Sequence, residues 1–293
     1  MTVLLGADWG SSSLHVFRIG ADGSILDTRR TSDGVFAGNG SFDSLLRSIF
    51  GDWLGDDLPI LLCGMIGSDR GWVHAPYVAA PANTADISRA MMCAPFERPA
   101  WIVPGVSFAD GETREVMRGE ETLIAGLLAR EKAGRATICL PGTHSKWVDI
   151  VDGRIAAFRT YMTGEIRASL LERGALATGV EQGPSADAFA EGVHAAGDGV
   201  TRALFQARAR RLLGRLASEH VAAFVDGVLI GDEVARETAS GGSPILAARG
   251  VIAEGYGAAL ALRGVAFRNV DPEPLAARGL LELARQAGIV ATA

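Results

Sequence analysis

Two stretches of the chain, Val3–Ile19 and Thr137–Val151, follow the same pattern. Each begins with an apolar run, breaks at a glycine with hydroxyl side chains beside it, and continues with alternating residues. This pattern is typical of two β-strands joined by a tight polar turn. An Asp-Gly hairpin signal follows each copy, at Asp22 and at Asp152, and the copies lie about 130 residues apart. The repeat therefore predicts two similar lobes, each of which opens with a three-stranded meander.

The two turns carry groups that suit phosphate. Glycine lets backbone N–H groups approach an anion closely, and hydroxyls add further donors. Asp8, at the first turn, is a carboxylate that can hold hydrated Mg²⁺. Either turn alone is equally well explained as an ordinary Gly/Ser hairpin, but two such turns favour one nucleotide held between two lobes. The candidate phosphate-binding residues are Gly10, Ser11, Ser12 and Ser13 in the first copy and Gly142, Thr143, His144, Ser145 and Lys146 in the second. His144 and Lys146 either face the phosphate or simply alternate along a strand.

Length and composition limit the possible classes of protein. The 293 residues suffice for two domains that each bury a core, and we place these domains at residues 1–133 and 134–293. A hydrophobic content of 48% with 21% charged residues is typical of a globular protein. The net charge of −6 argues against a nucleic-acid partner.

The cysteines and the hydropathy pattern bear on the compartment. The three cysteines are scattered, give no metal-ligand spacing and suit a reducing environment. No apolar run reaches the length of a membrane span, and no signal peptide is evident. We therefore expect a cytoplasmic protein.

Two common nucleotide-binding motifs are missing from the sequence. It contains no GxxxxGK[ST], and no GxGxxG follows a predicted strand. Nucleotide binding is therefore expected to be of the two-lobed type. Phe224–Ile230 predicts a strand that ends at Gly231 before a helix, and Pro244–Ala247 predicts a short strand before a helix at Gly250–Arg263. Either unit is a candidate for holding the adenosine, and Gly231 is included among the candidate cofactor-binding residues.

The loop Gly64–Trp72 is the candidate for a substrate site. The preceding residues, Leu58–Cys63, predict a short buried strand, and ligands of open α/β sheets bind beyond the carboxyl ends of the strands. The loop offers a hydroxyl, a carboxylate, a guanidinium and an indole, which are enough to bind a small polar acid. The alternative is a glycine-rich surface loop. The candidate substrate-binding residues are Ser68, Asp69, Arg70 and Trp72.

Two further stretches place carboxylates at the start of predicted helices. Glu120 and Glu121 precede a predicted helix at 122–132, and Thr163 and Glu165 stand where a strand enters the next helix. Carboxylates in a first helical turn suit the helix dipole, which is a sufficient structural reason for them. The functional interpretation is that Glu120 and Glu121 border the site and that Thr163 and Glu165 are further candidate substrate-binding residues.

Four segments carry a more specific resemblance. They are CGMIGSDRGW (Cys63–Trp72), MRGEET (Met117–Thr122), LPGTHSKWV (Leu140–Val148) and YMTGE (Tyr161–Glu165). Together they are similar to the 2-dehydro-3-deoxygalactonokinase family, within the superfold of actin-like ATPases and sugar kinases. The similarity extends over nearly the whole chain. It implies an α/β fold of two ribonuclease H-like lobes, each a mixed sheet flanked by helices, with the nucleotide in the cleft.

The resemblance also implies a reaction and the residues that carry it. Members of the family use ATP to phosphorylate 2-dehydro-3-deoxy-D-galactonate at its terminal (C6) hydroxyl in galactonate degradation. ATP and Mg²⁺ are then the expected cofactors, with Asp8 at the metal. Glu121 is the expected acceptor of the hydroxyl proton, with Glu120 beside it, because related connecting helices carry an acidic residue there. Arg70 is the best-placed cation for the substrate carboxylate.

Two other functions remain open from the sequence. The chain could be a kinase of another sugar or amino sugar with the same fold, or a non-enzymatic ATP-binding regulator. The expected partners are a sugar acid and ATP, with no nucleic acid and no membrane. A homodimer is a hypothesis that the sequence leaves undecided.

Overall fold

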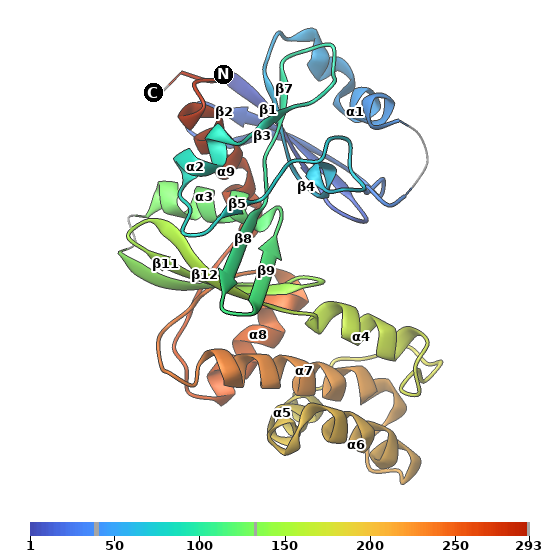
Figure 1. The fold of residues 1–293 in the computed structure, drawn as a ribbon. Coiled ribbons are helices and arrows are strands. Elements are labelled where there is room, and N and C mark those ends of the chain that lie inside the picture. The colour runs from blue at the N-terminus through green and yellow to red at the C-terminus, as the bar shows by residue number, and fades with distance from the viewer. Residues whose placement is uncertain (38–40, 132–133, 292–293) are drawn as a thin grey trace. The chain divides into compact units, whose positions relative to one another are not determined.

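The computed structural model describes residues 1–37, 41–131 and 134–291. Internal contacts divide the chain into two compact units (Figure 1). The first unit comprises Met1–Arg135, Asp149–Phe158 and Asp271–Ala293, and the second comprises Ala136–Val148 and Arg159–Val270. The predicted domain boundary after residue 133, and the last residue of the helix predicted at 122–132, lie outside the described residues.

The first unit is built on a six-stranded sheet with the strand order β3-β2-β1-β4-β7-β6. Its strands are β1 (Thr2–Trp9), β2 (Leu14–Gly20), β3 (Ile25–Thr31), β4 (Ile60–Gly64), β6 (Met92–Cys93) and β7 (Ala100–Ile102). β1, β2 and β3 pair antiparallel, which confirms the first predicted meander. β4 runs parallel to β1, so that Asp8 and Cys63 are partners at the carboxyl ends of both strands.

Helices and a small sheet complete the first unit. The helices are α1 (Phe42–Phe50), α2 (Thr84–Arg89), α3 (Glu120–Arg130) and α9 (Pro272–Gln286), and the small sheet has the order β5 (Val78–Ala79), β8 (Val106–Asp110) and β9 (Thr113–Met117). Ser41 caps α1, because its side chain accepts a hydrogen bond from the backbone N–H of Ser44. α3 and α9 pack at Gly126 and Gly279, where an added Cβ would meet a backbone oxygen of the other helix at 2.0 and 1.8 Å. Only glycine permits so close a contact.

The second unit contains most of a five-stranded sheet with the order β12-β11-β10-β13-β14. Its strands are β10 (Arg135–Leu140), β11 (Ser145–Val151), β12 (Arg154–Tyr161), β13 (Ile245–Ala247) and β14 (Arg268–Val270). The second predicted set of three neighbouring strands is therefore confirmed. β13 runs parallel to both β10 and β14.

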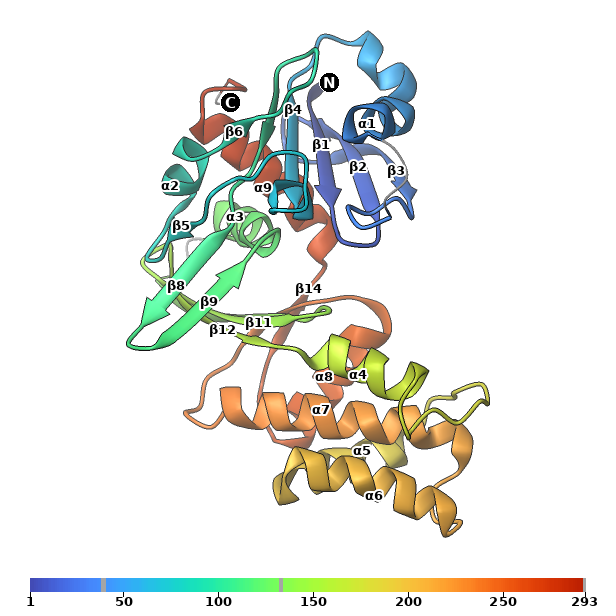
Figure 2. The same ribbon diagram turned by 45° about the vertical axis from the view of Figure 1, so that its right-hand side comes forward.

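Five helices belong to the second unit: α4 (Thr163–Glu172), α5 (Ala186–Ala195), α6 (Val200–Leu212), α7 (Val221–Glu237) and α8 (Gly250–Leu262). α7 lies beside α5 and α6 in both views (Figure 2). The strand predicted at Phe224–Ile230 is wrong, because these residues lie inside α7. α7 packs against four other α-helices, so apolar residues lie on several of its faces and form the run that the sequence reasoning took for a buried strand.

The same correction applies to Gly231, which does not end a strand. It is buried in α7, where an added Cβ would lie 2.9 Å from the Cα of Val193 in α5. Close helix packing therefore explains this glycine. No helix in the described part of the chain has the length and apolar character needed to cross a membrane.

Candidate functional site

The turn between β1 and β2 is held by backbone hydrogen bonds. The N–H of Gly10 donates to the carbonyl of Ser13 (2.9 Å), and the N–H groups of Val35 and Phe36 donate to the carbonyls of Gly10 and Ser11 (2.9 and 3.1 Å). Ser11, Ser12 and Ser13 are exposed, so their hydroxyls are available to a ligand. The predicted phosphate-binding residues of the first copy therefore lie together on one fixed turn.

Asp8 lies beside this turn at the carboxyl end of β1. An added Cβ on Gly64, at the end of β4, would lie 3.1 Å from the Oδ1 of Asp8. Burial, together with the charge of Glu120, raises the pKa of Asp8 to about 6. A cation would relieve both effects. The described residues contain no group of three or more His, Cys, Asp or Glu side chains placed to hold a metal ion. Since Mg²⁺ is commonly held by one or two carboxylates and several waters, Asp8 with Glu120 fits such an ion.

Glu120 and Glu121 begin α3 but lie in different environments. Glu121 is 0% exposed, and its carboxyl accepts hydrogen bonds from the N–H of Gly119 (2.7 Å) and the hydroxyl of Thr122 (3.2 Å). Burial and the charge of Glu120 raise the pKa of Glu121 to about 8. Glu120 is partly exposed and accepts a hydrogen bond from the N–H of Arg118 (3.0 Å). The structure thus brings Asp8, Glu120 and Glu121 together.

The loop after β4 separates the predicted substrate residues into two kinds. Asp69 and Arg70 are exposed, and the guanidinium of Arg70 lies 4.2 Å from the ring centre of Phe36. Ser68 is buried, and its hydroxyl has no hydrogen-bond partner among the described residues. Trp72 packs against the core of the first unit, so its indole has a structural reason to be there.

Arg118 is a residue that the sequence reasoning missed. Its Nη2 donates to the carbonyl of Ala75 (2.7 Å), and its guanidinium lies 4.5 Å from the ring centre of Tyr77. Its Nε and Nη1 have no hydrogen-bond partner in the described part of the chain. An added Cβ on Gly67 would lie 2.9 Å from Nη1, so Arg118 ties the loop after β4 to the start of α3. The only sequence signal was its place in the segment MRGEET.

The turn between β10 and β11 rests on the start of α4. Gly142, Thr143 and His144 are exposed. An added Cβ on Gly164 would lie 2.5 Å from the carbonyl oxygen of Gly142, and the N–H of Glu165 donates to the carbonyl of Thr143 (3.1 Å). The predicted residues of the YMTGE segment therefore support this turn.

The remaining residues of the second turn point in different directions. The Nε2 of His144 lies 2.5 Å from the Oε2 of Glu165, and both side chains are about half exposed. Lys146 is buried, and its Nζ donates to the carbonyl of His144 (3.3 Å). Ser145 is buried and hydrogen-bonds Tyr256 instead of facing solvent (2.7 Å). Thr163 is partly buried, and its hydroxyl donates to Glu233.

A pocket of about 860 Å³ lies beside the second turn, within the second unit. It is lined by the turn itself, by the start of α4, and by side chains of α5, α7 and α8. Residues from these five places include Gly142, Thr163, Phe189, Ile230 and Tyr256. An apolar pocket with a few polar groups, next to a phosphate-binding type of turn, has the size and chemistry to hold a base and a ribose.

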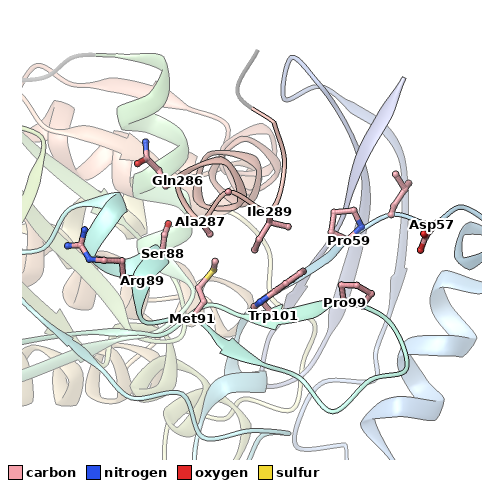
Figure 3. Close-up of a pocket in the computed structure, with 12 residues that line it drawn as sticks. Asp57, Pro59, Ser88, Arg89, Met91, Pro99, Trp101, Gln286, Ala287 and Ile289 are labelled. Carbon is pink, nitrogen blue, oxygen red and sulfur yellow. The ribbon is translucent and has the colours of Figure 1, made fainter.

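A second pocket, of about 760 Å³, lies in the first unit (Figure 3). Side chains of α2, the strand β7 and the segment after α9 line it, among them Arg89, Trp101 and Ile289. None of the predicted site residues lines this pocket. We therefore do not assign it to the predicted reaction.

Two units with matching strand–turn–strand openings, and a carboxylate cluster beside the first turn, define an α/β protein of the two-lobed actin-like ATPase and sugar-kinase class. Residues 8–283 match the family described as 2-keto-3-deoxy-galactonokinase, and the chain belongs to that family. A protein of Rhizobium meliloti (strain 1021), named a probable 2-dehydro-3-deoxygalactonokinase, is 36% identical over 294 residues, with 95% of each chain covered. The 2-dehydro-3-deoxygalactonokinase of Escherichia coli (strain K12) is 37% identical over 235 residues, with 79% of each chain covered.

Solved structures agree with this membership. A crystal structure from Sinorhizobium meliloti that carries a 2-dehydro-3-deoxygalactonokinase assignment has a TM-score of 0.88 and 34% identity, and the match covers 96% of this chain and 98% of that one. The activator of the 2-hydroxyisocaproyl-CoA dehydratase from Clostridium difficile matches with a TM-score of 0.53 and 13% identity, over 99% of this chain and 97% of that one. At that identity the likeness concerns the fold alone.

Proposed function

We propose that the chain is an ATP-dependent kinase that phosphorylates 2-dehydro-3-deoxy-D-galactonate at its terminal (C6) hydroxyl in galactonate catabolism. The observation that carries this proposal is the family match over residues 8–283, because it includes both turns and the carboxylate cluster. Phosphoryl transfer depends on a metal ion and on a positioned hydroxyl. The carboxylates of Asp8 and of the start of α3 are suited to bind the one and to orient the other. Mg²⁺ as the metal and the cytoplasm as the compartment belong to the same proposal, and the homodimer and the domain boundary after residue 133 remain predictions.

The nucleotide is proposed to use both turns. Backbone N–H groups and hydroxyls of Gly10–Ser13 and Gly142–Thr143 would donate to the phosphates, and the pocket of the second unit would hold the adenosine. Both α7 and α8 line this pocket, but only α8 follows a strand, β13, so the second of the two predicted strand–glycine–helix units is favoured. When bound, Mg²⁺ would supply charge neutralisation at the phosphates, held by Asp8.

The acceptor of the hydroxyl proton is proposed to be one of the two glutamates at the start of α3. The sequence favours Glu121, but its carboxyl is enclosed and accepts hydrogen bonds from its own turn. Glu120 is partly exposed and lies close enough to Asp8 to raise the pKa of that carboxyl. A general base must reach the proton that it accepts. We therefore assign acceptance of the hydroxyl proton to Glu120, and we assign to Glu121 the stabilisation of the first turn of α3.

The sugar acid is proposed to bind beside this carboxylate cluster, in the first unit. Arg70 offers an exposed guanidinium for the substrate carboxylate, with Asp69 next to it. Ser68 and Arg118 retain unused hydrogen-bonding groups in the same loop region. Thr163 and Glu165 belong to the second unit, where they support the Gly142 turn.

A substrate panel tests the proposed reaction. Purified protein is mixed with ATP, Mg²⁺ and one acceptor, and ADP release is measured for 2-dehydro-3-deoxy-D-galactonate, its gluconate epimer, glucose and N-acetylglucosamine. We expect efficient turnover with the galactonate derivative and little with the two neutral sugars. Turnover of a neutral sugar alone would favour the alternative kinase, and nucleotide binding without any turnover would favour the regulator.

A further inference from the structure

Glu233 is a buried carboxylate that is not among the predicted site residues and has no role in the proposed reaction. It lies in α7 and is 1% exposed. Its Oε1 accepts a hydrogen bond from the indole Nε1 of Trp147 (2.7 Å). Its Oε2 accepts hydrogen bonds from the hydroxyls of Tyr256 (2.8 Å) and Thr163. Three donors from three different elements thus converge on one carboxylate.

The network also extends to the second turn through Tyr256. Tyr256 donates its single hydroxyl proton to Glu233. The hydroxyl of Ser145 lies 2.7 Å from that of Tyr256, so Ser145 is part of the same network. Ser145 is the first residue of β11, immediately after the turn. Glu233 is consequently connected, through Tyr256, to the residue at which the turn ends.

The carboxylate of Glu233 also holds the start of α4, which is the second element that contacts the turn. Thr163 begins α4, and the next two residues contact the turn directly: Gly164 packs on the carbonyl of Gly142, and Glu165 donates its N–H to Thr143. Thr163 and Tyr256 also line the pocket beside the turn. β11, α4 and α8, which border the turn or line the pocket, are therefore each connected to Glu233.

A buried charge is a costly way to obtain stability, since well-packed apolar side chains often stabilise a core as well or better. Directional, charge-assisted hydrogen bonds fix distances and angles that apolar contacts leave loose. We propose that Glu233 is a positioning residue for the nucleotide: it holds the Gly142–Ser145 turn and the Tyr256 wall in the arrangement that binds ATP. This inference rests on the proposed function, because the ligand of the turn and pocket is the nucleotide assigned there.

The chain offers a matched control one helical turn further along α7. Glu237 is also nearly buried, with 5% of its side chain exposed. Its carboxylate accepts hydrogen bonds from the Nε and Nη2 of Arg159 and from the hydroxyl of Tyr161 (2.7 Å). Arg159, Tyr161 and Glu237 do not line the pocket beside the turn. A change at Glu237 therefore disturbs a buried carboxylate of the same helix without touching the turn.

The test compares Glu233→Gln with Glu237→Gln in the full chain. Binding of a non-hydrolysable ATP analogue and of the sugar acid is measured separately by calorimetry, together with the melting temperature. We expect Glu233→Gln to raise the Kd for the analogue roughly tenfold, because small displacements of binding groups are costly, and to leave the Kd for the sugar acid unchanged. Glu237→Gln should lower the melting temperature and leave both Kd values near those of the wild type.

Two results would overturn the inference. One is an unchanged Kd for the analogue in Glu233→Gln, and the other is an equal rise in Glu237→Gln, which would mark general destabilisation. Tyr256→Phe serves if Glu233→Gln does not fold, because it removes only the link between Ser145 and Glu233 and should raise the Kd about threefold. A wild type that binds no ATP analogue would reject the proposed function itself, and the inference with it.

Discussion

The two repeated turns have the same sequence pattern but different supports. The turn of Gly10–Ser13 is held by backbone hydrogen bonds, two of them from the neighbouring residues Val35 and Phe36. The turn of Gly142–Ser145 receives one backbone hydrogen bond, from Glu165, and is also held by side chains, through Ser145, Tyr256 and Glu233. A repeat in the sequence therefore predicts the shape of a turn but not what stabilises it.

The difference extends to the charges beside each turn. In the first copy a carboxylate, Asp8, stands two residues before the glycine, and the matching position of the second copy is the buried Leu140. In the second unit Glu233 is instead enclosed behind the turn, and the exposed Glu165 beside the turn pairs with His144. The first turn is thus equipped to hold a metal ion and the second to hold a fixed geometry.

The largest expected effect follows from Asp8. Asp8→Asn should abolish turnover while the fold is retained, because a neutral amide weakens the Mg²⁺ site at the first turn. The charge neutralisation lost is worth several kcal/mol, or roughly 1,000-fold in rate. The measurement is kcat over a range of Mg²⁺ concentrations, with circular dichroism as the control for folding. Leu140→Asn, at the matching position of the second copy, should leave the Mg²⁺ dependence unchanged. Near-normal activity of Asp8→Asn at saturating Mg²⁺ would contradict the proposal that Asp8 holds the metal ion.

The next effect separates the two glutamates of α3. Glu120→Gln should lower kcat by roughly 100-fold or more, which is the usual range for loss of a general base. Glu121→Gln should retain most of the activity, because an enclosed carboxyl does not reach the substrate. Single-turnover rates, with binding of the ATP analogue as the control, distinguish the two variants. The reverse result, with Glu121→Gln inactive and Glu120→Gln active, would restore the assignment that the sequence favours.

The buried carboxyl of Glu121 also predicts a pH dependence of stability. Its pKa is raised from 4.5 to about 8, so folding favours the protonated form. The stabilisation is fully present below pH 4.5 and is lost as the pH rises towards 8. Between these limits the free energy of unfolding should fall by on the order of a few kcal/mol relative to that of Glu121→Gln. Urea unfolding of both proteins at pH 5 and pH 8.5 measures this difference, and parallel pH profiles would show that Glu121 does not titrate this way.

Arg70 tests whether the sugar acid is recognised in the first unit. Arg70→Ala should raise the KM for the sugar acid roughly 10- to 100-fold and leave the KM for ATP nearly unchanged, since a hydrogen-bonded charge pair contributes about 1.5–3 kcal/mol. Arg89→Ala, an exposed arginine beside the other pocket, is the matched control. An equal rise in both KM values would argue against a specific carboxylate contact.

The sequence predicted the elements with strong local signals. The antiparallel pairs of β1, β2 and β3 and the short buried strand β4 follow from residues close together in the chain. The strand predicted at Phe224–Ile230 failed because a helix buried on several faces and a buried strand have similar apolar runs.

The candidate site was predictable only in part. Turns, glycines and paired carboxylates leave a local pattern, and the structure does bring Asp8, Glu120 and Glu121 together. The partners of Glu233 lie 86 and 70 residues away for Trp147 and Thr163, and 23 for Tyr256. Such a network exists only after the second unit has folded, so no local pattern predicts it.

The smallest expected effect compares one serine from each turn. Ser145→Ala removes the donor of a buried hydrogen bond and should cost about 1 kcal/mol in the free energy of unfolding. Ser12 is exposed, so Ser12→Ala should change stability by less than about 0.5 kcal/mol and act instead on the KM for ATP. Chemical unfolding of each variant, with the KM for ATP measured on the same preparations, separates support of a turn from contact with its ligand. If Ser12→Ala were destabilised and Ser145→Ala were not, side-chain support would belong to the first turn and not to the second.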